Sequence, residues 1–262
     1  WRHEFVAAAA EFVETFMFLF FAFSSTQVSH TSTRDAPAPG QPLDTNVLLY
    51  ITLSFGFSLI VNLWVFFRVS GGLFNPAATL GLCLIGAISP VRMVLYFIAQ
   101  MLACMSAPAV IEAILPGPLE VSTDLSVSIA RGIFLEMFLT SLLVFTIFML
   151  AAEKHRATYL APIGIGLALF VAHLVGINYT GASLNPARSF GPCVATRDFP
   201  GYHYVYWIGP FMGTLLAVGM YKIVKLVECE VLNPGQDSDG YQVYPRLLSL
   251  LPFRFSFLIP IK

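Results

Sequence analysis

Six long apolar stretches run through the chain, and they constrain its fold more than any other feature. A helix needs ~20 mostly apolar residues to cross a hydrocarbon core of ~30 Å. Backbone polar groups find no water inside a bilayer, so each stretch is predicted to be a helix. The chain is therefore predicted to be an all-α membrane protein with six transmembrane helices. The stretches are Phe5–Val28, Val47–Val69, Met93–Leu115, Gly132–Ala152, Tyr159–Ile177 and Tyr204–Val227.

The composition agrees with a membrane protein and argues against other classes. Hydrophobic residues make up 57% of the chain and charged residues 11%, whereas a soluble domain carries about 25% charged residues. The net charge of −1 argues against binding to nucleic acid. Nothing in the sequence reads as a catalytic, nucleotide-binding or ion-coupling cluster, so we expect no enzyme activity, no cofactor and no metal. The cysteines have no metal-like spacing; they are Cys83, Cys104, Cys193 and Cys229.

The distribution of lysine and arginine predicts the orientation. With the N-terminus in the cytoplasm, seven of these residues lie inside and three outside, which the positive-inside rule favours. Both termini are therefore predicted to be cytoplasmic, with a C-terminal tail over residues 228–262. Since no sorting signal is evident, we expect the plasma membrane. The inside residues are Arg2, Arg68, Arg92, Lys154, Arg156, Lys222 and Lys225, and the outside residues are Arg34, Arg131 and Arg197.

Two further apolar stretches are too short to cross the membrane, and each follows an Asn-Pro pair. They are predicted to be half-helices, one over 76–88 and one over 186–196. Their places among the spans correspond, and "EFVET" in the first span matches "EMFLT" in the fourth. We therefore interpret residues 1–118 and 119–227 as two copies of one unit. Because each copy crosses the membrane three times, the second is inverted, and short segments at matching places point to the functional site.

Each Asn-Pro-Ala motif is predicted to begin its half-helix. Asparagine is a strong N-cap, and proline suits the first helical position because its missing N–H is not needed there. In an inverted repeat the two N-termini meet near the midplane, each with about +0.5 charge from the helix dipole. A surface turn, which is common for Asn-Pro, does not explain two matching copies. The candidate pore residues are Asn75, Pro76, Ala77, Asn185, Pro186 and Ala187.

The paired motifs, the second within "TGASLNPARSFGP", make the chain resemble the aquaporin (major intrinsic protein) family. The resemblance covers about Glu11 to Val227. It implies six tilted helices and two re-entrant half-helices in an inverted repeat, with one pore in each subunit of a homotetramer. It also implies passive permeation of water across the lipid bilayer, driven by osmotic gradients.

The resemblance further places the narrowest point of the pore, where the solute is selected. A bulky ring, an imidazole and a guanidinium there leave little width, which implies a water-selective pore that excludes protons and ions. Glycerol pores of the family usually have a small residue in place of the histidine. They also have Asp directly after the arginine, where this chain has Ser189. The four positions correspond to Phe55, His173, Ala182 and Arg188.

Several alternatives stay open. A broader channel of the same family would also pass hydrogen peroxide, ammonia or glycerol, and hydrogen peroxide is close to water in size and polarity. A secondary transporter is also built from broken helices in inverted repeats, but it needs a counter-charge for its substrate at the midplane. A non-conducting adhesion or junction protein with this fold would have a blocked pore.

The family resemblance also implies roles for individual groups along the pore. Asn75 and Asn185 would donate to one central water and so interrupt a proton wire. Glu11 and Glu136 are expected to be structural, each accepting hydrogen bonds from the loop that leads into a half-helix. Glu14 departs from the small residue usual in the family, and nothing in the sequence accounts for it. The carbonyls expected to accept hydrogen bonds from water are those of Gly72, Leu73, Phe74, Gly181, Ala182 and Ser183.

Overall fold

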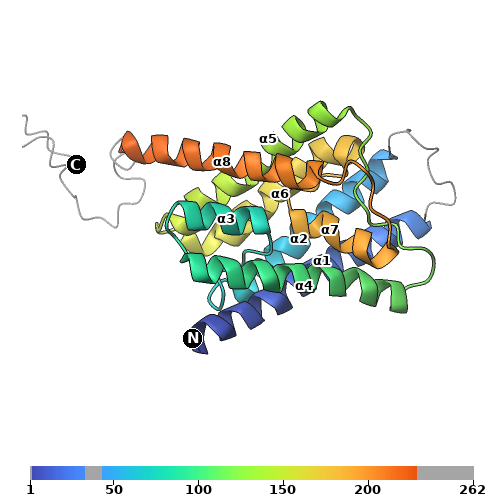
Figure 1. Ribbon diagram of the computed structural model, residues 1–262, viewed down its shortest axis with the longest axis horizontal. Helices are drawn as coiled ribbons and strands as arrows, with labels where there is room; N and C mark the ends of the chain where they lie inside the picture. The colour runs from blue at the N-terminus through green and yellow to red at the C-terminus, as the bar shows by residue number, and fades with distance from the viewer. Residues whose placement is uncertain (1, 33–42, 229–262) are drawn as a thin grey trace, which may run out of the picture. The chain divides into compact units, whose positions relative to one another are not determined.

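The computed structural model describes residues 2–32 and 43–228, which contain helices, turns and loops and no strand. Six helices of this part are long and apolar enough to cross a membrane (Figure 1). The prediction of an all-α protein with six spanning helices is therefore confirmed for the described residues. The long helices are α1 (Arg2–Ser32), α2 (Thr45–Phe66), α4 (Pro90–Ile114), α5 (Ile129–Ile147), α6 (Ala161–Thr180) and α8 (Val205–Leu226).

The ends of two long helices deviate from regular α-helix. A π-helical turn over Phe148–Ala152 extends α5, and a 3₁₀ turn over Thr158–Leu160 precedes α6. The chain divides into the units Trp1–Tyr221 and Lys222–Lys262, and the site described below belongs to the first. Of the second unit the structure describes residues 222–228. The rest of the predicted tail, Cys229 and Arg34 lie outside the described residues.

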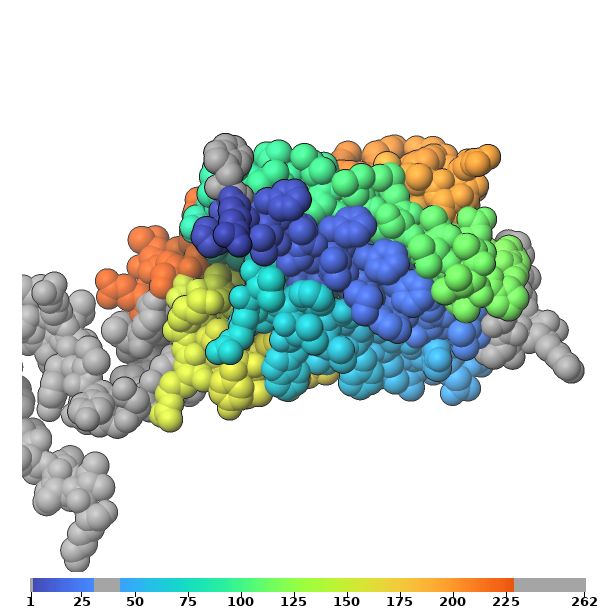
Figure 2. Space-filling view, turned by 90° about the horizontal axis from the view of Figure 1, so that it is seen from below, coloured from blue at the N-terminus to red at the C-terminus, as the bar shows by residue number. Residues whose placement is uncertain are grey.

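The helices follow an inverted repeat. Two long helices, a short helix and a long helix occur in that order twice, with α3 (Pro76–Leu84) and α7 (Pro186–Thr196) as the short ones. Helix α1 packs between α2 and α4 (Figure 2), and α2 also contacts α6. Helix α4 contacts α7. The matching contact between α8 and α3 includes a hydrogen bond of 3.0 Å from the Thr214 hydroxyl to the Ala77 carbonyl.

Both half-helices begin where the sequence predicts. Asn75 and Asn185 have extended backbone and cap α3 and α7, and each side-chain oxygen accepts from the N–H two residues later, at 2.8 and 3.0 Å. The first half-helix is shorter than predicted, because it ends at Leu84 rather than at residue 88. Gly86 has a φ of +81°, and the two hydrogen bonds that close the end of α3 form a Schellman motif. Since glycine adopts this left-handed conformation readily, the helix stops there.

Polarity is distributed as a bilayer requires. Large apolar side chains on the long helices are more than half exposed, for example Phe57, Val61, Phe138 and Leu215. The charged side chains of Glu11, Glu136 and Arg188, by contrast, are buried. Exposed apolar surface is favourable in lipid, and intramembrane charges face the protein interior. These observations agree with an integral multi-pass membrane protein.

Gly191 allows α7 to approach α4 closely, and its replacement gives a direct test of this packing. A Cβ at Gly191 would overlap the backbone carbonyl of Cys104. Overpacking costs about 1–3 kcal/mol where side chains yield, and a helix backbone yields less. Gly191→Ala is therefore expected to lower the thermal unfolding temperature in detergent strongly. Gly219→Ala is the control, because a Cβ there meets nothing within 4 Å; equal unfolding temperatures would contradict the described packing.

Candidate functional site

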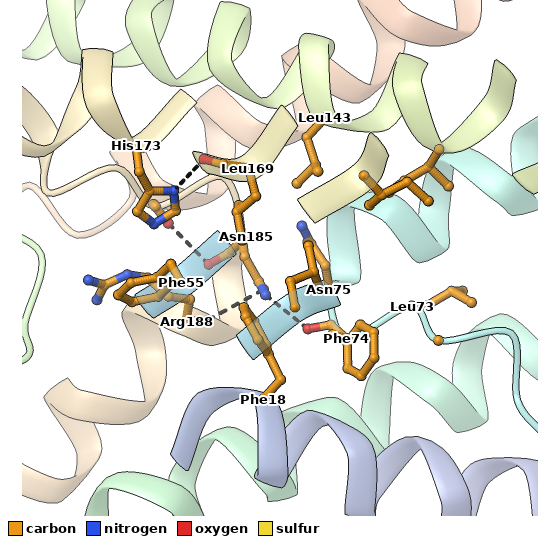
Figure 3. A pocket seen from close by; sticks show the side chains of 15 residues that line it. Phe18, Phe55, Leu73, Phe74, Asn75, Leu143, Leu169, His173, Asn185 and Arg188 are labelled. Atoms are coloured by element: carbon orange, nitrogen blue, oxygen red, sulfur yellow. Dashed lines mark hydrogen bonds between the residues drawn. The ribbon is translucent and has the colours of Figure 1, made fainter. Parts of the chain in front are cut away.

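A narrow cavity lies at the meeting point of the half-helices, bordered by α1, α2, α5 and α6 (Figure 3). The volume that the centre of a water-sized sphere can occupy in this cavity is about 20 Å³. A single water needs ~10–15 Å³ of such volume. The cavity is therefore large enough for a molecule the size of water. Its lining includes the apolar side chains of Phe18, Phe55, Leu59, Leu143, Ile147, Ile165 and Leu169. The other lining residues are Gly72, Leu73, Phe74, Asn75, His173, Ser183, Asn185 and Arg188.

The two capping asparagines lie next to each other in the cavity wall and are cross-linked by hydrogen bonds (Figure 3). Asn75 Nδ2 donates to the carbonyl of Leu184 at 2.8 Å, and Asn185 Nδ2 donates to the carbonyl of Phe74 at 2.9 Å. Each amide nitrogen carries two hydrogens, so one N–H of each side chain is used between the repeats and one is left. The centre of the cavity is thus rigid and rich in donors.

A buried carboxylate holds the loop before each half-helix. In the second repeat, Glu136 accepts from the N–H groups of Ser183 and Leu184 at 2.9 and 2.8 Å. In the first repeat, Glu11 accepts from the N–H of Phe74 at 2.6 Å. Phe74 and Leu184 have φ values of +54° and +52°, a conformation that non-glycine residues rarely adopt. The carboxylates stabilise this strained backbone by binding its N–H groups.

Arg188 is held at one end of the cavity by one hydrogen bond and two aromatic rings. Its Nη1 donates to the carbonyl of Val121 at 2.8 Å. Its guanidinium carbon lies 5.0 Å from the ring centre of Phe55 and 5.3 Å from that of Phe23. Such cation–π contacts fix a guanidinium without neutralising it. Arg188 Nε has no hydrogen-bond partner among the described residues.

His173 completes this end of the cavity. Its ring stacks on that of Phe55, with centres 4.5 Å apart. Its Nδ1 lies 2.9 Å from the carbonyl of Leu169, which only accepts, so Nδ1 carries the proton and Nε2 of the neutral ring is an acceptor. Nε2 has no partner within the described part of the chain. The constriction therefore presents the N–H groups of Arg188 that Val121 does not bind as donors and His173 Nε2 as an acceptor, which matches a small molecule that both donates and accepts.

The structure brings most of the predicted site residues to the cavity, but not all. Phe55, His173 and Arg188 line it, as do both asparagines. Ala182 is fully buried without bordering the cavity. Pro76, Ala77, Pro186 and Ala187 are likewise buried and absent from its wall, and the partly buried Gly181 is absent from it too.

The expected carbonyl row differs from the structure at Gly181 and Ala182, which do not line the cavity, and at Phe74. Gly72, Leu73, Phe74 and Ser183 line the cavity, but the Phe74 carbonyl already accepts from Asn185. Sequence reasoning did not identify Phe18 or Phe23. Phe18 lies two helical turns after Glu11, on the same face of α1, which was an available signal. No local pattern distinguishes Phe23 from the other phenylalanines.

Comparisons with known proteins agree with one another. A family model described as Major intrinsic protein matches residues 2–221. "Aquaporin-7" of Botryotinia fuckeliana is 54% identical over 241 residues, covering 90% of this chain and 53% of that protein. "Aquaporin-1" of Gibberella zeae is 51% identical over 241 residues, covering 91% of this chain and 75% of that protein. The chain spans about half the length of the first of these curated relatives.

A solved structure has the same fold. The aquaglyceroporin from Plasmodium falciparum superimposes with a TM-score of 0.66, covering 85% of this chain and 99% of that one, at 20% sequence identity. At this identity the likeness concerns the arrangement of helices and half-helices, including the inverted repeat.

Proposed function

Since the chain belongs to the major intrinsic protein family, we propose that it forms a passive, water-selective channel driven by osmotic gradients. The observation that carries the proposal is the constriction made by Phe55, His173 and Arg188. The Phe55 and His173 rings stack with centres 4.5 Å apart, and the Arg188 guanidinium lies 5.0 Å from the Phe55 ring. The cavity that these three side chains line has an accessible volume of about 20 Å³, which suits a molecule the size of water. The unused N–H donors of Arg188 and the acceptor on His173 replace hydrogen bonds that water loses on entry.

Water would cross the centre in single file. The free N–H groups of Asn75 and Asn185 would donate to the oxygen of one water, whose hydrogens then point away from the centre in both directions. A proton wire needs an uninterrupted donor direction, so the wire breaks at this water. The positive ends of α3 and α7 and the charge of Arg188 add a barrier to protons and cations, as in other aquaporin-type pores.

The proposal extends to the setting of the channel. Both termini would be cytoplasmic, since the positive-inside count is seven against three. Four subunits would assemble, each with its own pore, in the plasma membrane. The chain would act without enzymatic chemistry.

The test is osmotic shrinkage of proteoliposomes followed by stopped-flow light scattering, with glycerol and hydrogen peroxide entry measured in parallel. The wild-type chain is expected to raise water permeability with a low activation energy and to exclude glycerol. His173→Gly is expected to admit glycerol while retaining water permeability, because the stacked imidazole is gone. Glycerol entry into wild-type vesicles at the rate of His173→Gly would overturn water selectivity. Shrinkage no faster than empty liposomes would overturn the channel itself.

A further inference from the structure

The inverted repeat provides an internal comparison, because each copy holds its pore loop in its own way. In the second copy, a single carboxylate binds the whole loop. Glu136 accepts from the Thr180 hydroxyl at 2.6 Å and from the N–H groups of Ser183 and Leu184. Thr180 in turn accepts from the N–H of Ala182 at 3.2 Å.

The first copy has the same hydroxyl but a different acceptor. Ser70 lies five residues before Asn75, just as Thr180 lies five before Asn185. Ser70 Oγ likewise accepts from the N–H two residues later, that of Gly72, at 3.1 Å. Its hydrogen, however, is donated to Glu14, while Glu11 takes the role of Glu136. The first loop is therefore held by two carboxyl groups rather than one.

Glu14 is an addition to one repeat only. It lies three residues after Glu11, and the residue three after Glu136 is Leu139. Glu14 is 0% exposed and Leu139 is 6% exposed, so both occupy interior positions. A leucine at this position satisfies the fold, and the carboxyl group of Glu14 needs a separate explanation.

The surroundings of Glu14 leave room for only one negative charge. Its Oε2 is buried and has no hydrogen-bond partner among the described residues. The groups that act on it electrostatically are Glu11 and Ser70, and no lysine or arginine of the described chain is among them. Two carboxylates that share a buried site without a cation cannot both be ionised. One of the two therefore carries a proton.

The other titratable groups around the pair do not supply the missing positive charge. Tyr96 on α4 donates its hydroxyl to the Ser70 carbonyl at 2.7 Å and interacts electrostatically with both acids. Arg92, one turn before Tyr96 on α4, donates to the carboxylate of Glu4 at 2.7 and 2.8 Å. Its charge is already paired.

We propose that Glu11 and Glu14 bind one proton between them, and that this proton holds the loop 70–74 in its conducting position. The consequence for permeation rests on the proposed function. Loss of the proton places two negative charges side by side and repels Glu14 from Glu11. Ser70 follows Glu14 through its hydrogen bond, and Gly72, the first lining residue of that loop, follows Ser70. Water permeability thus falls as the pH rises through loss of this proton.

The proton itself is tested by infrared spectroscopy on the full chain in lipid. The wild type is expected to show the carbonyl stretch of a protonated, buried carboxylic acid, and Glu14→Gln and Glu14→Leu are expected to lose it. Glu112→Gln, an exposed carboxyl group on α4, is the matched control and is expected to retain the band. A band that persists unchanged in Glu14→Gln would overturn the proposal.

The effect on the loop is tested by stopped-flow permeability over a range of pH. Wild-type permeability is expected to fall several-fold at alkaline pH. Glu14→Gln keeps an acceptor for Ser70 and a donor for Glu11 without titrating, so its permeability is expected to stay at the neutral-pH value. Glu14→Leu, which copies the second repeat, is also expected to be flat. A Glu14→Gln profile identical to the wild type would contradict the coupling.

The two proposals fail separately. The infrared band does not depend on conduction. Loss of the band in Glu14→Gln from a wild type that conducts no water would support the proton site and overturn the proposed channel function. Rapid water flux through the wild type, together with a band that is unchanged in Glu14→Gln, would support the channel function and overturn the proton site.

Discussion

Replacing Arg188 with valine is expected to make the channel leak protons and small cations. Arg188 is the one lysine or arginine side chain that is buried in the described chain, at 4% exposure. A unit charge ~5 Å from the guanidinium meets about 3 kcal/mol of repulsion at an effective dielectric constant of about 20. Removing this barrier corresponds to a rate increase of about 100-fold. Water permeability is expected to stay within about threefold of wild type, because the asparagine pair is untouched.

The leak is measured as dissipation of a pH gradient across proteoliposomes with an entrapped dye, and as methylammonium uptake. Arg131→Val makes the same substitution at an exposed position near the start of α5 and is expected to leave both fluxes at the wild-type level. If the proton and methylammonium fluxes through Arg188→Val equalled those of the wild type, the barrier would come from the half-helix ends, and the assigned role of Arg188 would be wrong.

Replacing Glu136 with leucine is expected to lower the free energy of unfolding by several kcal/mol, because three buried donors lose their acceptor. The carboxylate accepts from Thr180 Oγ1 at 2.6 Å, from Ser183 N at 2.9 Å and from Leu184 N at 2.8 Å. Each donor left unsatisfied in the interior costs about 1–3 kcal/mol. The total is a large share of the ~5–15 kcal/mol by which folded domains are typically stable. Leu184 would also lose the bond that stabilises its positive φ.

The measurement is the yield of monodisperse protein in detergent, its thermal unfolding and its water permeability. Little folded protein, or protein that unfolds far earlier and conducts no water, is the expected outcome for Glu136→Leu. Glu112→Leu applies the same change to an exposed position on α4 and is expected to behave as wild type. Normal stability and conduction of Glu136→Leu would show that the loop holds its shape without the carboxylate.

The two kinds of variant separate structure from selectivity. Arg188→Val is expected to leave a folded channel that selects poorly, because the side chain points into a cavity that other residues shape. Glu136→Leu is expected to disrupt the loop that shapes the cavity, since the carboxylate binds the backbone N–H groups of that loop. Both side chains are intramembrane charges, so their sequence context alone does not tell them apart.

The sequence by itself determined the features that short segments encode. The lengths of the apolar stretches are sufficient for six helices, because a bilayer forces each such stretch to satisfy its own backbone. The Asn-Pro pairs are sufficient for the starts of α3 and α7, because capping is a contact between a side chain and the next turn. The end of α3 at Leu84 also has a local cause, the glycine at position 86. The sequence-based prediction extended the helix to residue 88 because the apolar stretch continues past this glycine. The comparison with a known family then supplied the identity of the constriction.

Only the tertiary structure decided which side chains meet across the repeats. Asn75 binds a carbonyl 109 residues away, and Arg188 takes its acceptor from Val121 and its second ring from Phe23. The partner of Glu14 is Ser70, 56 residues along the chain. Hydrophobic pattern and capping propensity act over one or two helical turns. They do not specify which of many similar phenylalanines, or which buried acid, is brought within hydrogen-bonding distance when the helices pack.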